Sequence, residues 1–352
     1  MPRLSTSLLR KARAIDRFLP PLLGPCRDLR AAQNELRWLR EHADNAPGPK
    51  ARDALLKQMV EDRATGKPLQ YVLGTEYFGP LEIECKAGVL IPRQETAASV
   101  THLVHMLRQS PQLPSEFRVL DLCTGTGCIP LLFRHELYAM RKDIDLRCIG
   151  IDISKTALEL ARRNLKRIDL DEENGKRGTI EFLEADVLID EYSEHTMESL
   201  RAILNWQRKP RFWDVLISNP PYISPEDYWK TTTRSVRGFE PKLALVPPKV
   251  RGDMEVEEAD VFYPRLLEIA QDSEAKVVLF EVADLNQAER VARMAQNLEI
   301  FDGIEIWRDQ PDGTDNDTPN QPQLEFPVIG SGHGRSVVCW RGAGAFWKVW
   351  DR

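Results

Sequence analysis

The chain has 352 residues, of which 42% are hydrophobic and 29% charged, as is typical of a soluble globular protein. No uninterrupted apolar run approaches the ~20 residues of a membrane-spanning helix, which argues against a membrane protein. The net charge of −6 argues against a protein that coats nucleic acid. Six cysteines without Cys-x-x-Cys pairs or zinc spacing predict reduced thiols in an intracellular compartment and no metal site.

The first 15 residues are basic and contain no acidic side chain. Four of them are Lys or Arg and three are Ser or Thr, a composition typical of a mitochondrial transit peptide. A basic first helix of the mature fold is the alternative interpretation. We favour targeting, which predicts a location in the mitochondrial matrix, with the cytoplasm as the alternative.

Two helical patterns follow, over residues 29–42 and 51–64, and a breaker rich in Pro and Gly separates them. We therefore expect residues 1–65 to comprise the basic segment and a small helical domain. Residues 66–92 are rich in Gly, Tyr and β-branched side chains. This composition predicts a hairpin-like linker.

Strands and helices alternate through residues 93–352, with seven strands at 118–122, 146–151, 179–183, 213–218, 275–282, 299–307 and 335–340. Such alternation predicts a parallel sheet with helices on both faces. The polar stretch near 310–333 lacks periodicity and is expected to be a disordered surface insertion. Residues 228–252 hold six basic side chains and one acid, which indicates a solvated loop or a surface for an acidic partner, RNA or protein.

A glycine-rich turn, Cys123-Thr124-Gly125-Thr126-Gly127, follows the first strand of this region and leads into a helix. Such a turn lets the backbone approach a ligand, and the helix N-terminus offers unpaired N–H donors. Taken alone the pattern is weak, because nicotinamide- and flavin-binding folds use similar turns. The missing third glycine counts against a dinucleotide.

Two acidic residues lie at the ends of the next two strands. Asp152 follows the second strand, where a carboxylate can accept hydrogen bonds from both hydroxyls of a ribose. Asp152 also precedes a helix, so it can serve as an N-cap, and one turn can hold both roles. Asp186 follows the third strand, where the edge of an adenine would lie. Together with the glycine turn, these acids favour a cofactor that contains a nucleoside.

The fourth strand ends in Asn219-Pro220-Pro221-Tyr222. Two prolines would stop a strand on their own, but a strand end needs neither the Asn nor the Tyr. The Asn219 side-chain oxygen and the Pro220 carbonyl can accept both N–H bonds of a planar nitrogen, and Tyr222 can stack on its plane. Catalysis would then consist of alignment and electrostatic support, without a metal.

These features together resemble class I, S-adenosylmethionine-dependent methyltransferases that act on amide or exocyclic nitrogens. That group includes DNA adenine methyltransferases, so the motif alone does not choose the substrate. Further segments resemble the HemK-type release factor glutamine methyltransferases, namely residues 66–74, 89–96 (Val-Leu-Ile-Pro-Arg-Gln-Glu-Thr), 239–245, Glu281 with Gln287, and 334–335.

The resemblance implies a Rossmann-like domain with a seven-stranded sheet and helices on both faces, preceded by a small helical domain. It implies methylation of the side-chain amide nitrogen (N5) of the glutamine in the Gly-Gly-Gln motif of a peptide-chain release factor. S-adenosylmethionine would be held by Thr124, Gly125, Thr126, Gly127, Asp152, Asp186, Val187 and Asn219. The glutamine would be held by Arg93, Asn219, Pro220, Pro221 and Tyr222, of which Asn219, Pro220 and Tyr222 would be catalytic.

The resemblance also implies a protein substrate gripped in part by the N-terminal helices. We expect a monomer that needs neither a membrane nor direct contact with nucleic acid. The alternative function is N6-adenine methylation of DNA or RNA, with the base turned out of its stack.

Three positions depart from the family pattern. Cys123 replaces a glycine, and since a left-handed Cys costs ~1–2 kcal/mol we expect an ordinary backbone conformation there. Gln94 replaces a proline, and Ala283 stands where the family often has glycine. None of the three lies within Asn219–Tyr222.

Overall fold

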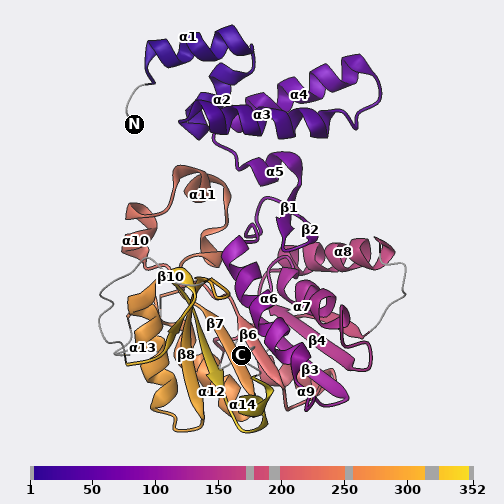
Figure 1. Ribbon diagram of the computed structural model, residues 1–352, viewed down its shortest axis with the longest axis vertical. Coiled ribbons are helices and arrows are strands. Elements are labelled where there is room, and N and C mark those ends of the chain that lie inside the picture. Colours follow the sequence, from indigo (N-terminus) through magenta and orange to yellow (C-terminus); the bar gives the residue numbers. More distant parts are fainter. Residues whose placement is uncertain (1–3, 172–177, 190–198, 250–256, 314–324, 349–352) are drawn as a thin grey trace.

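The protein is represented by a computed structural model that describes residues 4–171, 178–189, 199–249, 257–313 and 325–348. Four helices within residues 4–64 pack around a core of their own, at the top of Figure 1. They are α1 (Thr6–Ile15), α2 (Leu19–Cys26), α3 (Leu29–Ala43) and α4 (Pro49–Ala64). Fully buried leucines from α2 and α3, among them Leu22 and Leu39, form the centre of this bundle.

Of these helices, α2 was not predicted from the sequence, and α1 was predicted only as the alternative to a targeting segment. Helix α2 escaped detection because three of its eight residues are proline; two of them occupy its first turn, where a missing N–H costs little. Helix α1 comprises much of the basic segment that we interpreted as a targeting sequence. Ser5 caps it by accepting the Leu8 N–H at 3.1 Å, and Ala12 is buried in the bundle. In the structure this segment is therefore part of the helical bundle.

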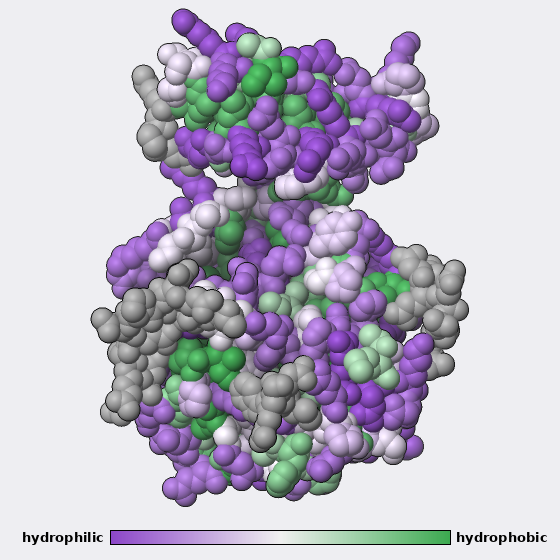
Figure 2. Space-filling model, in the orientation of Figure 1, coloured by the Kyte–Doolittle hydropathy of each residue, from purple (hydrophilic) through white to green (hydrophobic). Residues whose placement is uncertain are grey.

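A hairpin connects the bundle to the larger part of the molecule. Strands β1 (Thr75–Phe78) and β2 (Leu81–Glu84) pair antiparallel, as the composition of residues 66–92 suggested, and a short helix α5 (Leu69–Leu73) precedes them. The Ser235 hydroxyl donates to the Gly66 carbonyl at 2.7 Å and adds a second link between the two parts. Figure 2 shows a narrow waist at this level of the molecule.

The larger part is built on a mixed sheet of eight strands within the described residues, in the order β5-β4-β3-β6-β7-β10-β8-β9. They are β3 (Glu116–Leu122), β4 (Asp145–Asp152), β5 (Thr179–Glu184), β6 (Val215–Ser218), β7 (Val277–Glu281), β8 (Gly303–Gln310), β9 (Val328–Ile329) and β10 (Ser331–Trp340). The predicted fold class is confirmed. The sheet differs from the prediction in the two-residue strand β9 and in β10, which runs antiparallel to both its neighbours.

Helices cover both faces of the sheet, as Figure 1 shows. One face packs against α6 (Gln94–Gln109), α7 (Cys128–Tyr138), α8 (Lys155–Asp171) and α14 (Ala343–Trp347). The other packs against α9 (Leu200–Trp206), α12 (Phe262–Asp272) and α13 (Leu285–Gln296). Strand side chains alternate between two cores, with Val119 in the first and Leu120 in the second. Burial on both faces explains why these strands read as nearly continuous apolar runs.

The basic stretch at 228–252 contains more regular structure than the predicted loop. It overlaps α10 (Pro225–Lys230), α11 (Arg234–Phe239) and the 3₁₀ turn η1 (Lys242–Ala244), while residues 250–252 lie outside the described part. Of the predicted insertion near 310–333, residues 314–324 also lie outside it. Residues 328–329 form β9 and β10 begins at 331, so the end of that segment belongs to the sheet. Among the described helices, none has the length and apolar character needed to cross a membrane.

Candidate active site

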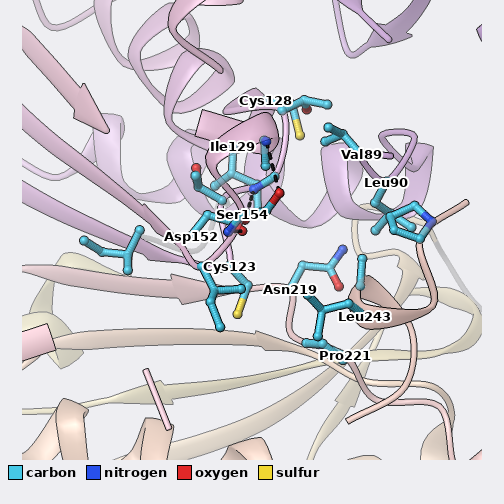
Figure 3. A pocket seen from close by; sticks show the side chains of 18 of the residues that line it. Val89, Leu90, Cys123, Cys128, Ile129, Asp152, Ser154, Asn219, Pro221 and Leu243 are labelled. Carbon is cyan, nitrogen blue, oxygen red and sulfur yellow. Dashed lines mark hydrogen bonds between the residues drawn. The ribbon is translucent and has the colours of Figure 1, made fainter. Parts of the chain in front are cut away.

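The carboxyl ends of four neighbouring parallel strands, β5, β4, β3 and β6, open into one cavity (Figure 3). The turns after these strands contribute Asp186, Asp152, Gly125 and Asn219 to its wall. Residues 88–93, before α6, and several residues between 241 and 248 add to the lining. Ligand sites of open α/β sheets lie at this edge, so the cavity is the candidate active site.

The turn after β3 begins with a strained residue. Cys123 has a φ of 64°, so the expectation of an ordinary backbone conformation was wrong. Two hydrogen bonds fix the path of this turn, from Thr124 N–H to the Ile151 carbonyl at 2.8 Å and from Gly127 N–H to the Thr124 carbonyl at 2.9 Å. The path demands a left-handed residue at Cys123, and packing of its side chain against the core offsets part of the strain.

The two glycines of the turn have different roles. Gly125 has a φ of 54° and borders the cavity, and a Cβ built there would find no atom within 4 Å. Its backbone is therefore open to a ligand. Gly127 does not line the cavity, and its Cβ would lie 2.7 Å from the Phe182 ring, so this glycine permits α7 to start close to β5. Thr124 and Thr126, both nearly buried, lie in the cavity wall.

Asp152 connects two of the four turns. Its Oδ2 accepts the Gly125 N–H and its Oδ1 accepts the Ser154 N–H, each at 2.8 Å (Figure 3). Burial raises the pKa of Asp152, and the backbone N–H bonds oppose that rise. The carboxylate also lines the cavity, and its two oxygens together have about four lone pairs, so its capping role leaves room for a ligand hydroxyl.

Asp186 and Val187 follow β5 and both line the cavity. Asp186 accepts the Leu188 N–H through Oδ1 at 2.9 Å, which fixes the turn. Val187 is buried and presents an apolar surface beside the carboxylate. This combination suits the face and the polar edge of a flat heterocycle.

Asp121 was not singled out from the sequence. It is fully buried in β3; its Oδ2 accepts the Thr124 hydroxyl, while no partner for Oδ1 exists among the described residues. Burial raises the pKa of Asp121 to about 8. A signal was available, because an acid inside an apolar strand is rare unless it is paired or functional.

Asn219 is held from the side of α6. Its Nδ2 donates to Thr96 Oγ1 at 3.3 Å, and Thr96 in turn donates its hydroxyl to Glu281 Oε2. Both Asn219 and Thr96 line the cavity. Since one N–H of the Asn219 amide is bonded to Thr96, the amide oxygen lies at the other end of the group and is available to a ligand as an acceptor. Thr96 lies within the segment 89–96 that resembles the family, but its sequence context alone indicated no role for it.

Glu281 is a buried acid at the end of β7 that accepts from two hydroxyls. Besides the Thr96 bond, its Oε1 accepts the Tyr222 hydroxyl at 3.0 Å. Burial raises the pKa of Glu281, and the hydrogen bonds from Thr96 and Tyr222 and the charge of Arg335 oppose the rise. Burial likewise raises the pKa of the Tyr222 phenol, which therefore remains a donor.

The remaining residues of the Asn219–Tyr222 motif lie at different depths. Pro221 lines the cavity, whereas Pro220 and Tyr222 are not among its lining residues. The Tyr222 ring packs against the core, and its carbonyl accepts from Gln287 Nε2 at 3.3 Å. Gln287 also accepts the Ala283 N–H at 2.7 Å, so the motif is connected to the start of α13.

Arg93 lines the cavity and is paired with the buried acid Glu240. Its guanidinium donates to both oxygens of Glu240, at 2.8 and 2.9 Å, and Glu240 Oε2 also accepts the Ile91 N–H at 3.1 Å. The Glu240 side chain is 2% exposed and that of Arg93 32%. The pair connects residues 88–93 with the segment after α11. The geometry therefore gives Arg93 a role in holding together two segments of the cavity wall.

Comparisons with known proteins identify the family of this chain. It is 36% identical over 248 residues to the mitochondrial MRF1 N(5)-glutamine methyltransferase MTQ1 of Saccharomyces cerevisiae, covering 70% of this chain and 68% of the relative. It is 33% identical over 277 residues to the probable MRF1 mitochondrial N(5)-glutamine methyltransferase mtq1 of Schizosaccharomyces pombe, covering 78% and 83%. A release factor glutamine methyltransferase of Chlorobaculum tepidum is 34% identical over 53% of this chain and 55% of its own.

No family model matches the chain. Among solved structures, a human methyltransferase 10 domain containing protein is 15% identical with a TM-score of 0.44, covering 80% of this chain and 96% of that one. The assignment rests on the sequence relatives, two of which match over two thirds or more of their own length. The chain therefore belongs to the family of release factor glutamine methyltransferases.

Proposed function

We propose that this chain transfers a methyl group from S-adenosylmethionine to the side-chain amide nitrogen (N5) of the glutamine in the Gly-Gly-Gln motif of a peptide-chain release factor. The observation that carries the proposal is the orientation of Asn219, whose amide oxygen is available to a ligand in the cavity. The names of the relatives, which act on MRF1 or on release factors, support the substrate.

The residues around the cavity fit S-adenosylmethionine. The Asp152 carboxylate can accept a ribose hydroxyl in addition to its backbone N–H bonds. We assign Asp186 and Val187 to the adenine, and Thr124, Gly125 and Thr126 to the wall beside the methionine portion. Gly127 supports this wall from behind through its close packing. When bound, S-adenosylmethionine supplies an electrophilic methyl group.

Asn219 and Pro220 are the residues that we assign to the glutamine amide. An amide nitrogen is a poor nucleophile because its lone pair is delocalised into the carbonyl. Acceptance of its two N–H bonds by Asn219 Oδ1 and the Pro220 carbonyl would fix the nitrogen and favour positive charge on it during transfer. The nitrogen then releases one of its two protons to water, so that the products are N5-methylglutamine and S-adenosylhomocysteine. Pro221 forms the adjacent wall, and Tyr222 holds the motif through its hydroxyl on Glu281.

We also propose that the reaction takes place in mitochondria. The two relatives matched over most of their length are named as mitochondrial. We assign the N-terminal helices, and the cavity wall that Arg93 holds together, to contact with the release factor. The enzyme acts as a monomer on a protein substrate.

The test is mass spectrometry of a release factor incubated with this protein and S-adenosylmethionine. We expect a mass gain of one methyl group on the glutamine of the Gly-Gly-Gln motif, and none on a release factor in which Ala replaces that glutamine. No gain, with cofactor binding confirmed by calorimetry, would overturn the proposed substrate. Methyl transfer to adenine in nucleic acid under the same conditions would then support the alternative.

A further inference from the structure

The Asn219 amide can serve as an acceptor only if its oxygen, rather than its nitrogen, faces the cavity. The two ends of an Asn side chain are nearly the same in size and shape, so packing alone does not choose between them. A flipped amide would present two N–H donors to the N–H bonds of the substrate. The neighbours of Asn219 must therefore determine its orientation.

Thr96 and Glu281 determine the orientation of the Asn219 amide through the direction of their hydrogen bonds. Glu281 accepts the Tyr222 hydroxyl on Oε1 and the Thr96 hydroxyl on Oε2. The single hydroxyl proton of Thr96 is thus committed to Glu281, and only lone pairs of Thr96 Oγ1 remain for Asn219. A lone pair can bond only the nitrogen end of the amide, and Asn219 Nδ2 donates to Thr96 Oγ1 at 3.3 Å.

Burial of Thr96 and Glu281 stabilises this arrangement of hydrogen bonds. Thr96 is 5% exposed and Glu281 4% exposed, so water does not readily replace either partner. The two residues come from α6 and β7, while Asn219 follows β6, so three elements meet at this point. An unmade hydrogen bond in such a place is costly, which favours one orientation of the amide over the other.

We propose that Thr96 is a positioning residue that, with its proton held by Glu281, keeps the Asn219 oxygen directed at the substrate nitrogen. This inference rests on the proposed function, since it specifies how the acceptor of that reaction is oriented. Thr96 acts through Asn219 and is not itself a group that takes part in methyl transfer.

The kinetic test is Thr96→Val, which preserves the shape of the side chain and removes both the lone pairs and the proton. We expect kcat for release factor methylation to fall by ~10- to 100-fold, the scale of a misdirected polar group. The KM for the release factor and the Kd for S-adenosylmethionine should each change by less than about threefold, since less than ~0.7 kcal/mol of binding is involved. Thr96→Ser restores the hydroxyl and should recover kcat to within about threefold of wild type.

A matched control comes from the same helix. Ser99 is buried one turn further along α6, and its hydroxyl lies 3.0 Å from that of Ser336. Among the described residues it makes no hydrogen bond to Asn219, Thr96 or Glu281. Ser99→Ala removes a buried hydroxyl from α6 without touching Asn219 and should leave kcat unchanged. Equal losses in Thr96→Val and Ser99→Ala would indicate general damage to α6 and overturn the proposal.

A double-mutant cycle separates action through Asn219 from an independent effect. In an Asn219→Ala background, Thr96→Val should cause no further loss of kcat, because the amide that it orients is already gone. If the losses of kcat from Thr96→Val and Asn219→Ala multiply in the double variant, the proposal is overturned. A normal kcat in the single variant Thr96→Val, which retains Asn219, would overturn it as well.

A second measurement needs no substrate and so distinguishes failure of this inference from failure of the proposed function. In ¹⁵N-labelled protein, the side-chain NH₂ resonances of Asn219, identified by their loss in Asn219→Ala, should shift in Thr96→Val and return in Thr96→Ser. They should not move in Ser99→Ala. Unshifted resonances in Thr96→Val would overturn the inference even if wild-type protein methylates the release factor. Absence of methylation by wild-type protein would overturn only the proposed function.

Discussion

Asp152 accepts the N–H of Gly125 through Oδ2 at 2.8 Å and so ties the end of β4 to the turn that follows β3. One carboxylate thereby fixes the two backbone segments between which a nucleoside would bind. From the sequence, Asp152 could be a helix cap, a ribose ligand or both. The structure shows the capping bonds, and they leave room for a ribose hydroxyl.

We expect Asp152→Ala to weaken S-adenosylmethionine binding by ~10- to 100-fold, the scale of losing charged hydrogen bonds. Asp145→Ala is a suitable control, because Asp145 is an exposed acid at the other end of the same strand. Calorimetric titration of both variants with S-adenosylmethionine checks the prediction. An unchanged affinity in Asp152→Ala would reject the ribose assignment.

Asn219→Ala should reduce turnover by at least ~100-fold while the protein remains folded. The side chain is only partly buried and lies in the cavity wall, so its removal leaves the cores intact. Asn205→Ala, at an exposed position on α9, is the matched control and should have wild-type activity. Circular dichroism would verify folding, and near-normal turnover in folded Asn219→Ala would refute the proposed role.

The sequence predicted the parts of this site that depend on short, local patterns. Strand ends are visible as apolar runs followed by turn residues, so Gly125, Asp152, Asp186 and Asn219 could each be placed at the edge of a parallel sheet. Strand neighbours in such a sheet bring these ends together, and the structure confirms that they line one cavity. The fold class followed from the same alternation.

What the sequence could not provide is contact between distant segments. Thr96 is hydrogen-bonded to Asn219, which is 123 positions away in the sequence, and to Glu281, which is 185 positions away. The periodicity of a short segment does not predict contacts between such distant residues. Helix α2 was missed for a different reason, because its prolines read as breakers although two of them lie in its first turn. Cys123 was misjudged because the demand for a positive φ comes from hydrogen bonds to the neighbouring strand end.

The strain at Cys123 predicts that Cys123→Gly is more stable than Cys123→Ala, which is the reverse of the usual order for Gly and Ala. Ala is ordinarily more stable than Gly by ~0.5–1 kcal/mol within regular structure. At a φ of 64° a Cβ is unfavourable, so Cys123→Gly should be more stable than Cys123→Ala by about 1 kcal/mol. Both variants lose the thiol, and the comparison therefore isolates the backbone effect. Urea unfolding of the two proteins checks it, and the ordinary order would show that the turn is not strained.

Asp121 predicts a dependence of stability on pH. Burial raises its pKa from 3.8 to about 8, so between these values the folded protein keeps a proton that the unfolded chain has released. Stability falls with rising pH wherever the folded state binds more protons, at most by ~1.4 kcal/mol per pH unit for one group. The contribution of Asp121 is thus most favourable at acidic pH and declines until the pH passes about 8, where the folded state also loses the proton.

Asp121→Asn removes this titration while it retains an oxygen that can accept the Thr124 hydroxyl. The free energy of unfolding of Asp121→Asn, minus that of wild type, should therefore increase from pH 5 to about 8 and then level off. Denaturant unfolding at a series of pH values, without S-adenosylmethionine, measures this difference. A difference that stays constant across the series would show that Asp121 is ionised in the folded protein at acidic pH. Its unpartnered Oδ1 would then need a buried donor, such as an ordered water molecule, to balance the charge.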